Sequence, residues 1–180
     1  MTEISLVRID EKNLRKIREL GFREDQPEWK KWDGPYFVGD YQKYESFDDF
    51  KAKEGEFFLS DRLRAIIAKG KLVGVVTKYW EDERTRWLDI GITIYRKENW
   101  NQNIGTRALS LWIDEIFKTT EKLAHIGLVT WSGNQRMIKA AQKLGMKMEA
   151  RIRKVRYYQN TYYDSLTFGI LREEWKNERI

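Results

Sequence analysis

The chain has 180 residues, with 34 lysines and arginines against 28 acidic residues, one histidine and no cysteine. The absence of cysteine excludes disulfides, thiolate nucleophiles and cysteine zinc sites, and a lone histidine excludes any site that needs two. The formal net charge of +6 fits an anionic partner, such as nucleic acid or a phosphorylated cofactor, or an ordinary solvated surface.

Apolar periodicity, capping residues and turn residues divide the chain into short elements. In chain order we expect a strand at 5–9, a helix at 10–20, a loop at 22–44, a helix at 47–53, strands at 63–69, 72–80 and 87–95, a helix at 104–119, a strand at 124–131, a helix at 134–144, and strands at 146–156 and 162–171. Two strand–helix–strand units late in the chain favour a mixed sheet with helices on both faces. We therefore expect one α/β (α+β) domain over residues 1–180.

Residues at the ends of these elements account for the boundaries. Asp10 and Ser46 are expected as helix N-caps, and Gly145 as a left-handed C-terminal cap. Turns are expected at residues 69–71, 81–83 and 159–160. The loop at 22–44 holds both prolines, and so long a loop in a compact domain is usually functional or mobile.

The segment from residue 89 to residue 107 carries the clearest chemical signal. A strand with a lone glycine, Gly91, between Asp89 and Thr93 leads through an Asn-rich loop into a helix. The first turn of a helix presents backbone N–H groups and the positive end of the helix dipole, which together suit a diphosphate. An ordinary helix start, with a glycine packed under a neighbour such as Trp87, explains the same residues without a ligand.

Residues 100–106, Trp-Asn-Gln-Asn-Ile-Gly-Thr, resemble the acetyl-CoA pyrophosphate loop of the GNAT N-acetyltransferase superfamily, whose pattern is Q/R-x-x-G-x-G/A. Gly105 matches the last position, whereas Trp100 replaces Gln or Arg and Asn103 replaces the first glycine. Asparagine suits that position because it tolerates positive φ. Later segments resemble the second family signature and the branch of ribosomal-protein N-terminal and spermidine acetyltransferases: residues 131–134 and 143–146 for the signature, and 162–175 for the branch.

This resemblance implies an acyl-CoA N-acyltransferase fold, with a largely antiparallel sheet and a splayed parallel strand pair. Acetyl-CoA would be the co-substrate, and an amine would attack its thioester directly, without a metal. Asp89 is implied as the base, or as the residue that orders a water for this role. Asn134 is implied as a contact of the pantetheine arm or of a water near it, and equally fits an N-cap. The implied cofactor-binding residues are Ile92, Thr93, Ile94, Asn101, Gln102, Asn103, Ile104, Gly105, Thr106, Arg107, Asn134 and Lys143.

The resemblance also concerns the general acid that protonates the CoA thiolate and the residues that bind the acceptor amine. Many relatives place a tyrosine seven residues after the asparagine to protonate the CoA thiolate, whereas this chain has Ala141 there. The thiolate leaves without an acid, or Tyr157 or Tyr163 substitutes. The implied acceptor wall consists of aromatic residues that suit amines through cation–π contact and equally suit a second core: Trp29, Trp32, Tyr36 and Phe37.

Two other functions are left open. A nucleic-acid or ribosome-binding module would use basic and aromatic residues of the last hairpin to follow phosphates: Arg151, Arg153, Lys154, Arg156, Tyr157 and Tyr158. A solvated hairpin face explains them more simply. The missing tyrosine also fits a CoA-binding relative without turnover. His125 begins an apolar strand, which favours a structural role.

The remaining expectations concern compartment and partners. The start of the chain has no apolar signal-peptide region, and the longest apolar runs are about five residues against the roughly 20 that span a bilayer. We therefore expect a cytoplasmic enzyme without membrane contact. Its expected partners are acetyl-CoA and an amine acceptor, with nucleic acid disfavoured and the C-terminal hairpin as a candidate homodimer edge.

Overall fold

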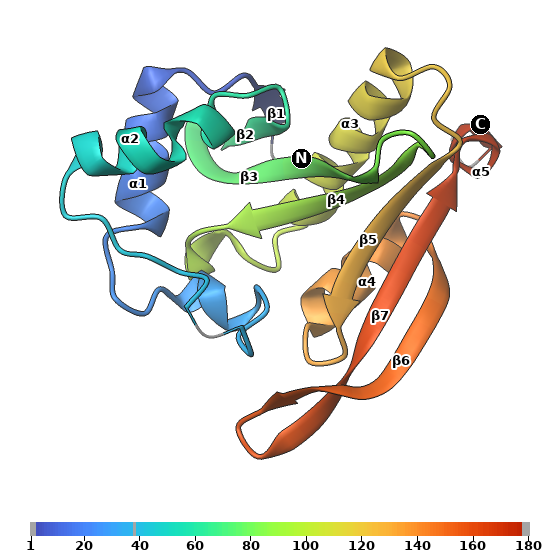
Figure 1. Ribbon diagram of the computed structural model, residues 1–180. Helices are drawn as coiled ribbons and strands as arrows, with labels where there is room; N and C mark the ends of the chain where they lie inside the picture. Colours follow the sequence, from blue (N-terminus) through green and yellow to red (C-terminus); the bar gives the residue numbers. More distant parts are fainter. Residues whose placement is uncertain (1–2, 38, 178–180) are drawn as a thin grey trace. The chain divides into compact units, whose positions relative to one another are not determined.

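The computed structural model describes residues 3–37 and 39–177 (Figure 1). Its elements are β1 (Ile4–Val7), α1 (Glu11–Gly21), the 3-10 helix η1 (Glu28–Lys31), α2 (Phe47–Phe58), β2 (Leu63–Ala68), β3 (Lys71–Asp82), β4 (Trp87–Ile94), the 3-10 helix η2 (Lys97–Asn99), α3 (Ile104–Thr119), β5 (His125–Trp131), α4 (Gln135–Lys143), β6 (Lys147–Tyr158), β7 (Thr161–Leu171) and α5 (Arg172–Asn177).

The strands follow the order β1-β2-β3-β4-β5-β7-β6 in a mixed sheet. Antiparallel pairing joins β1 to β2, β2 to β3, β5 to β7 and β6 to β7, whereas β4 and β5 run parallel with Asp89 opposite Gly127. This arrangement confirms the predicted α/β class with a largely antiparallel sheet and one parallel strand pair.

Contacts divide the chain into two compact units. Unit 1 comprises Met1–Thr77 and Ile92–Ala108, and unit 2 comprises Lys78–Gly91 and Leu109–Ile180. The strands β3 and β4 and the helix α3 therefore each contribute residues to both units. The single domain expected over residues 1–180 stays a prediction.

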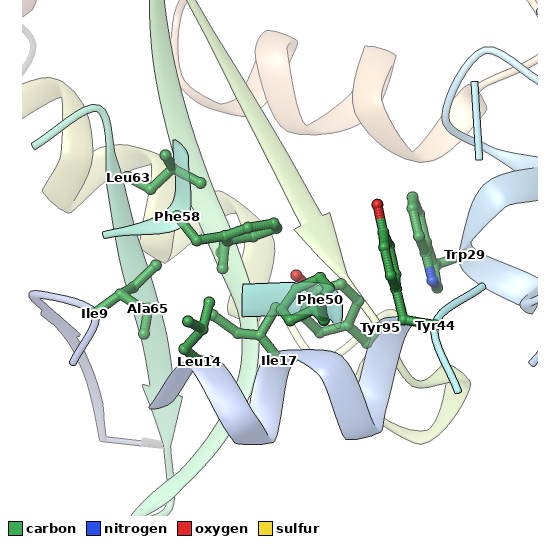
Figure 2. Close-up of a cluster of buried hydrophobic side chains, with 11 residues drawn as sticks. Ile9, Leu14, Ile17, Trp29, Tyr44, Phe50, Phe58, Leu63, Ala65 and Tyr95 are labelled. Atoms are coloured by element: carbon green, nitrogen blue, oxygen red, sulfur yellow. The ribbon is translucent and has the colours of Figure 1, made fainter. Parts of the chain in front are cut away.

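Helices α1 and α2 of unit 1 pack beside each other over an aromatic core (Figures 1 and 2). The predicted N-caps are confirmed, since the Asp10 side chain accepts the Asn13 N–H and the Ser46 hydroxyl accepts the Asp49 N–H. The core side chains come from both helices, from β2 and β3, from the loop between the helices, and from the residues just before α1 and just after β4: Ile9, Leu14, Ile17, Trp29, Tyr44, Phe50, Phe58, Leu63, Ala65, Val75 and Tyr95.

Gly74 sets how closely β3 approaches the end of β4 within unit 1. A Cβ at residue 74 would lie 2.1 Å from the Thr93 carbonyl oxygen and 3.0 Å from the Ile94 Cα. Next to this contact, the Tyr95 N–H donates to the Val73 carbonyl at 3.1 Å. The neighbours of Gly74 are backbone atoms, so they cannot turn away from an added methyl as the end of a flexible side chain can.

Gly74→Ala is therefore expected to lower the free energy of unfolding by about 2–3 kcal/mol, because the methyl forces two strands apart. Gly55→Ala is the matched control, since its Cβ would meet only Lys51 Cγ at 3.4 Å and Leu14 Cδ2 at 4.0 Å. Alanine also favours a helix interior over glycine. Chemical denaturation compares the two variants, and equal stabilities would show that β3 is not held tightly against β4 here.

Unit 2 is built on β5, β7 and β6, with α4, α5 and most of α3. The predicted caps of α4 are confirmed, because the Asn134 side chain accepts the Met137 N–H and Gly145 adopts a φ of 76°. Gln159 and Asn160 are both left-handed, with φ of 47° and 59°, as a tight β6–β7 hairpin requires.

The main differences from the predicted elements are a longer helix, a longer strand and an additional helix. Helix α2 runs to Phe58 rather than residue 53, because Phe58 is buried in the core. β3 continues through Asp82, so the predicted turn at 81–83 begins one or two residues later. Helix α5 was not predicted, since it depends on Arg172, whose guanidinium donates to the Leu123 and Phe117 carbonyls at 2.7 and 2.8 Å. Within residues 3–37 and 39–177, no helix is long and apolar enough to cross a bilayer.

Candidate cofactor and catalytic site

The loop before α3 leads from the end of β4 into the helix, entirely within unit 1. Asn101 and Asn103 have left-handed backbones with φ of 58° and 60°, a conformation that asparagine tolerates better than most residues. The Asn103 carbonyl accepts the Arg107 N–H at 3.2 Å, so the helix begins there. The N–H groups of residues 104–106 thus occupy the first turn, where a helix offers them no internal acceptor.

Charge at the start of α3 favours an anion. α1 begins with Glu11 and α2 with Asp48 and Asp49, and these carboxylates neutralise the positive helix ends. α3, whose residues are all described, has no acidic residue in its first turn, and Arg107 lies half-buried there. A bound diphosphate would therefore meet the helix dipole, first-turn N–H groups and a cation together.

Gly105 is not required by the backbone conformation or by close packing. Its φ lies outside the left-handed region, and a Cβ would meet only Ile94 Cδ1 at 3.6 Å and Ile92 Cδ1 at 3.7 Å, which are ordinary contact distances. The structure thus brings the helix start against two of the strand residues predicted to bind the cofactor. Strand residues 92–94 and loop residues 101–107 form one continuous candidate cofactor site in unit 1.

The backbone at the end of β4 is partly committed to other partners. The Thr93 carbonyl faces Gly74 of β3, and strand alternation turns the backbone groups of Ile92 and Ile94 to the opposite edge. There the Ile94 carbonyl accepts the Trp100 Nε1–H at 2.9 Å. An arm that binds as an added strand would therefore meet the backbone of Ile92 and Ile94, and contact of the cofactor with Thr93 stays a prediction.

Trp100 shows how the loop keeps its shape without the Gln or Arg of the family pattern. Its indole donates to Ile94, and its ring lies edge-on to Trp32 with centroids 6.3 Å apart. In the same loop, the Gln102 side chain donates to the Glu98 carbonyl. In the sequence Trp100 is only a departure from the family pattern, because nothing in the sequence shows where an indole N–H donates.

Trp100→Phe keeps an aromatic ring and removes the N–H donor to Ile94. Affinity for acetyl-CoA is expected to fall about five- to tenfold, the equivalent of roughly one net hydrogen bond that positions the loop. Isothermal titration calorimetry measures this, with Trp80→Phe in β3 as the control that leaves affinity unchanged. If Trp100→Phe bound acetyl-CoA as tightly as the original chain, the indole bond would not be what holds the loop.

Asp89 of unit 2 is a buried carboxylate, 1% exposed, opposite Gly127 of β5. Its Oδ1 has no hydrogen-bond partner among the residues that the structure describes. Burial, and then the charge of Glu81, raises the pKa of Asp89 to about 6. A carboxylate with this pKa and an open acceptor oxygen can take up a proton at neutral pH.

The other predicted cofactor contacts of unit 2 lie at the two ends of α4. The Asn134 side chain caps the helix, accepting the Met137 N–H at 3.2 Å, and is buried. Lys143 is the last helical residue and is exposed, where a cation interacts favourably with the helix dipole. Contact of either residue with a cofactor stays a prediction.

Trp29 lies in the core rather than on an acceptor wall. It is 8% exposed, and its ring lies beside that of Tyr95, with centroids 5.9 Å apart (Figure 2). Its indole N–H donates to the Gly21 carbonyl at 3.0 Å. The prediction of Trp29 as a substrate-binding residue is therefore wrong, because its ring fills the core and its one polar atom is bound there.

The other three aromatic residues of that loop are more accessible. Phe37 is 47% exposed, and its ring packs against Tyr36 with centroids 4.8 Å apart. Trp32 is half-buried and reaches Trp100 of the cofactor loop. Trp32, one of the predicted acceptor residues, therefore lies beside the candidate cofactor site within unit 1.

Ala141 is fully buried in α4, and its methyl group has no proton to give to a thiolate. Of the two tyrosines predicted as substitutes, Tyr157 lies by the hairpin turn, where its hydroxyl donates to Asn160 Oδ1 at 3.2 Å. Tyr163 instead packs edge-on against Trp131, with centroids 4.8 Å apart, at the carboxyl end of β5. The role of either tyrosine as an acid stays a prediction.

The basic hairpin does not carry a continuous row of cations. Asp164 of β7 accepts Arg151 Nε at 2.6 Å and the Lys154 N–H at 2.9 Å, and these bonds lower the pKa of its carboxyl. Lys154 is left-handed, with φ of 56°, where the β6–β7 register shifts. This neutralised, irregular strand does not favour the nucleic-acid alternative.

No group of three or more His, Asp or Glu side chains in the described parts of the chain is placed to hold a metal ion. Metal-independent transfer stays a prediction.

A family model described as an acetyltransferase (GNAT) domain matches residues 5–147 of the chain. Solved structures with this fold include a GNAT-family acetyltransferase from Bacillus anthracis, with 18% identity, 97% of this chain and 98% of that chain covered, and a TM-score of 0.73. A spermidine N-acetyltransferase from Vibrio cholerae, solved with CoA and spermine, has 18% identity, the same coverage and a TM-score of 0.74.

A spermidine/spermine N-acetyltransferase from the same species, solved with manganese ions, has 18% identity, covers 99% and 98% of the two chains, and has a TM-score of 0.69. At these identities the likeness concerns the fold. No curated protein matches the sequence.

Proposed function

Since the chain belongs to the GNAT acetyltransferase family, we propose that it transfers the acetyl group of acetyl-CoA directly to a primary amine of a small molecule or a protein N-terminus. The start of α3 carries this proposal. Left-handed Asn101 and Asn103 lead into a helix start whose first-turn N–H groups have no acceptor within the helix, and no carboxylate of that turn competes for them. The diphosphate of acetyl-CoA is the anion that this arrangement fits.

The strand end and Asp89 supply the chemistry. Backbone groups of Ile92 and Ile94 hold the arm that carries the thioester, and a backbone N–H polarises the carbonyl, a device worth about 2.7–4 kcal/mol per donor. Asp89, three residues before Ile92 on β4, removes a proton from the acceptor ammonium directly or through an ordered water. The amine nitrogen then forms the new C–N bond, and the CoA thiolate leaves.

The leaving thiolate takes a proton from water or from Tyr163. A free thiol has a pKa of about 8.5, so its thiolate is a good leaving group near neutral pH without a dedicated acid. The buried Ala141 therefore does not oppose turnover. Asn134 keeps its predicted contact with the arm beside its role as a cap.

The acceptor is proposed to lie against Trp32, Tyr36 and Phe37, whose rings suit a cationic amine. The Vibrio cholerae relative was solved with spermine, which supports an amine acceptor and the proposed placement in the spermidine and ribosomal-protein N-terminal branch. A cytoplasmic location and a homodimer through the C-terminal hairpin stay predictions beside this proposal.

Turnover of an amine panel tests the proposal. Thiol release from acetyl-CoA is followed with small diamines, polyamines, amino sugars and peptides with free N-termini, and the absence of cysteine in the chain keeps the background low. Amine-dependent thiol release with an N-acetylated product is expected. Saturable acetyl-CoA binding without turnover on any amine would instead favour a CoA-binding relative. If the chain showed no acetyl-CoA binding and no turnover, the assignment would be overturned.

A further inference from the structure

Three ionisable side chains lie in a row over two glycines in unit 2. Asp89 of β4 is opposite Gly127 of β5, and Gly127 is opposite Gly169 of β7. The position that a Cβ at residue 127 would take lies 2.0 Å from Asp89 Oδ1 and 3.3 Å from His125 Cε1. The missing side chain at Gly127 thus lets the Asp89 carboxyl and the imidazole lie next to each other.

Glu149 of the edge strand β6 completes the row on the same face of the sheet. The β6–β7 register shifts between Met148 and Ala150, and this bulge turns Glu149 over the second glycine. Its carboxylate lies 2.3 Å from the position of a Cβ at Gly169. Both carboxylate oxygens bond to His125 Nε2, at 3.0 and 3.1 Å. His125 therefore has a defined partner, which the sequence expectation of a plain structural histidine did not include.

Exposure rises steadily along this row. Asp89 is 1% exposed, whereas the side chains of His125 and Glu149 are 26% and 40% exposed. The Trp87 indole bonds to the Asp89 carboxyl, but Oδ1, the oxygen over Gly127, has no partner among the described residues. A buried acceptor oxygen without a partner, beside an imidazole that leads outward to a solvated carboxylate, is an arrangement suited to moving a proton.

We propose that His125 and Glu149 carry to solvent the proton that Asp89 takes from the acceptor ammonium. This inference rests on the proposed acetyl transfer. The ammonium N–H bond breaks, its electron pair stays on nitrogen for the attack, and an O–H bond forms on Asp89. A water between the Asp89 carboxyl and the imidazole takes this proton and gives one of its own to His125, Nε2 gives its proton to Glu149, and the Glu149 carboxyl releases it to water, which restores all three groups.

Two further carboxylates lie near the ends of this row. Glu81 of β3 also acts on Asp89, and Glu174 of α5 lies within electrostatic reach of His125 while paired with Lys147. His125 and Glu149 do not touch the substrate. They affect the reaction only through Asp89, by taking the proton away from it.

The test compares His125→Gln, Glu149→Gln and the control Glu174→Gln, which removes a carboxylate near His125 that is outside the row. His125→Gln is expected to lower kcat roughly tenfold or more at pH 7, with the KM for acetyl-CoA unchanged. Imidazole added to the assay is expected to restore kcat in proportion to its concentration, because it takes the proton from Asp89. Glu149→Gln is expected to show a smaller loss of kcat. For Glu174→Gln, kcat should stay unchanged with and without imidazole.

Each outcome decides the proposal. Unchanged kcat in His125→Gln, or a loss that imidazole does not restore, would overturn the relay and leave acetyl transfer intact. Absence of amine-dependent turnover in the unmodified chain would remove the proposed function and the relay together. Calorimetric binding of acetyl-CoA by each variant shows that it is folded, so a lost relay is distinguished from a lost structure.

Discussion

Asp89→Asn is expected to lower kcat by about 10²–10⁴-fold at pH 7, the range in which a general base contributes to proton transfer. The KM for acetyl-CoA should stay unchanged, since Asp89 does not belong to the cofactor loop. The deficit should narrow as the pH approaches about 10, where a primary amine deprotonates in water without help. Rate profiles with one good amine substrate measure this, and Asp48→Asn, an exposed carboxylate of α2, is the control.

The same variant carries an expectation for stability. Burial raises the pKa of Asp89 to about 6 in the folded chain, above its ordinary value of 3.8. Between these values the native state holds a proton that the unfolded state has lost, so the contribution of Asp89 to stability falls as pH rises from about 4 to about 7. The free energy of unfolding of Asp89→Asn relative to the original chain should therefore increase by up to about 3 kcal/mol over that range.

Denaturant unfolding of both proteins at a series of pH values isolates this effect, because the carboxyls with lowered pKa values, such as Asp164 and Glu174, are common to both. Activity lost and relative stability gained in one variant would identify a buried carboxylate kept for function. A constant stability difference between pH 4 and 7 would show that Asp89 ionises as an exposed carboxyl does, and would remove the case for it as a base.

Asn103→Asp is expected to weaken acetyl-CoA binding about 100-fold at low salt without loss of stability. The change is nearly isosteric and adds a negative charge at the start of α3, where a carboxylate favours the helix dipole and repels a diphosphate. The difference should shrink as salt screens the exposed charge. Calorimetric titration at two salt concentrations measures both effects.

Asn103→Gly is the matched control for this substitution. Glycine adopts the left-handed conformation of residue 103 without strain and adds no charge, so acetyl-CoA should bind as tightly as to the original chain. Equal losses of affinity in the two variants would mean that the asparagine side chain itself, rather than the field at the helix start, holds the ligand.

Local rules in the sequence were enough to place most elements. Asp10, Ser46 and Asn134 cap helices because their side-chain oxygens accept N–H groups three residues on. Residues 159 and 160 define the last hairpin because both adopt the left-handed backbone of a tight turn. The resemblance to the GNAT family rested on such short-range features, and the expectation of a largely antiparallel sheet with one parallel strand pair came from that resemblance.

Tertiary contacts decide what the sequence did not predict. Trp29 and Trp32 lie in one aromatic loop, yet only Trp29 enters the core, because its indole reaches the Gly21 carbonyl. The alternation of residues along β4 predicts which face of the sheet Asp89 lies on, but not that its carboxyl is buried. The partnership of His125 with Glu149 depends on a bulge in β6, and no pattern of residue types marks where a strand gains an extra residue.

The central claim is that the start of α3 binds acetyl-CoA, and its most direct test is calorimetric titration of the unmodified chain. The expected result is saturable binding at one site per chain, weaker at higher salt, with desulfo-CoA still binding and acetylpantetheine, which lacks the diphosphate, binding far more weakly. No detectable heat at millimolar acetyl-CoA, or binding that does not depend on the diphosphate, would contradict it.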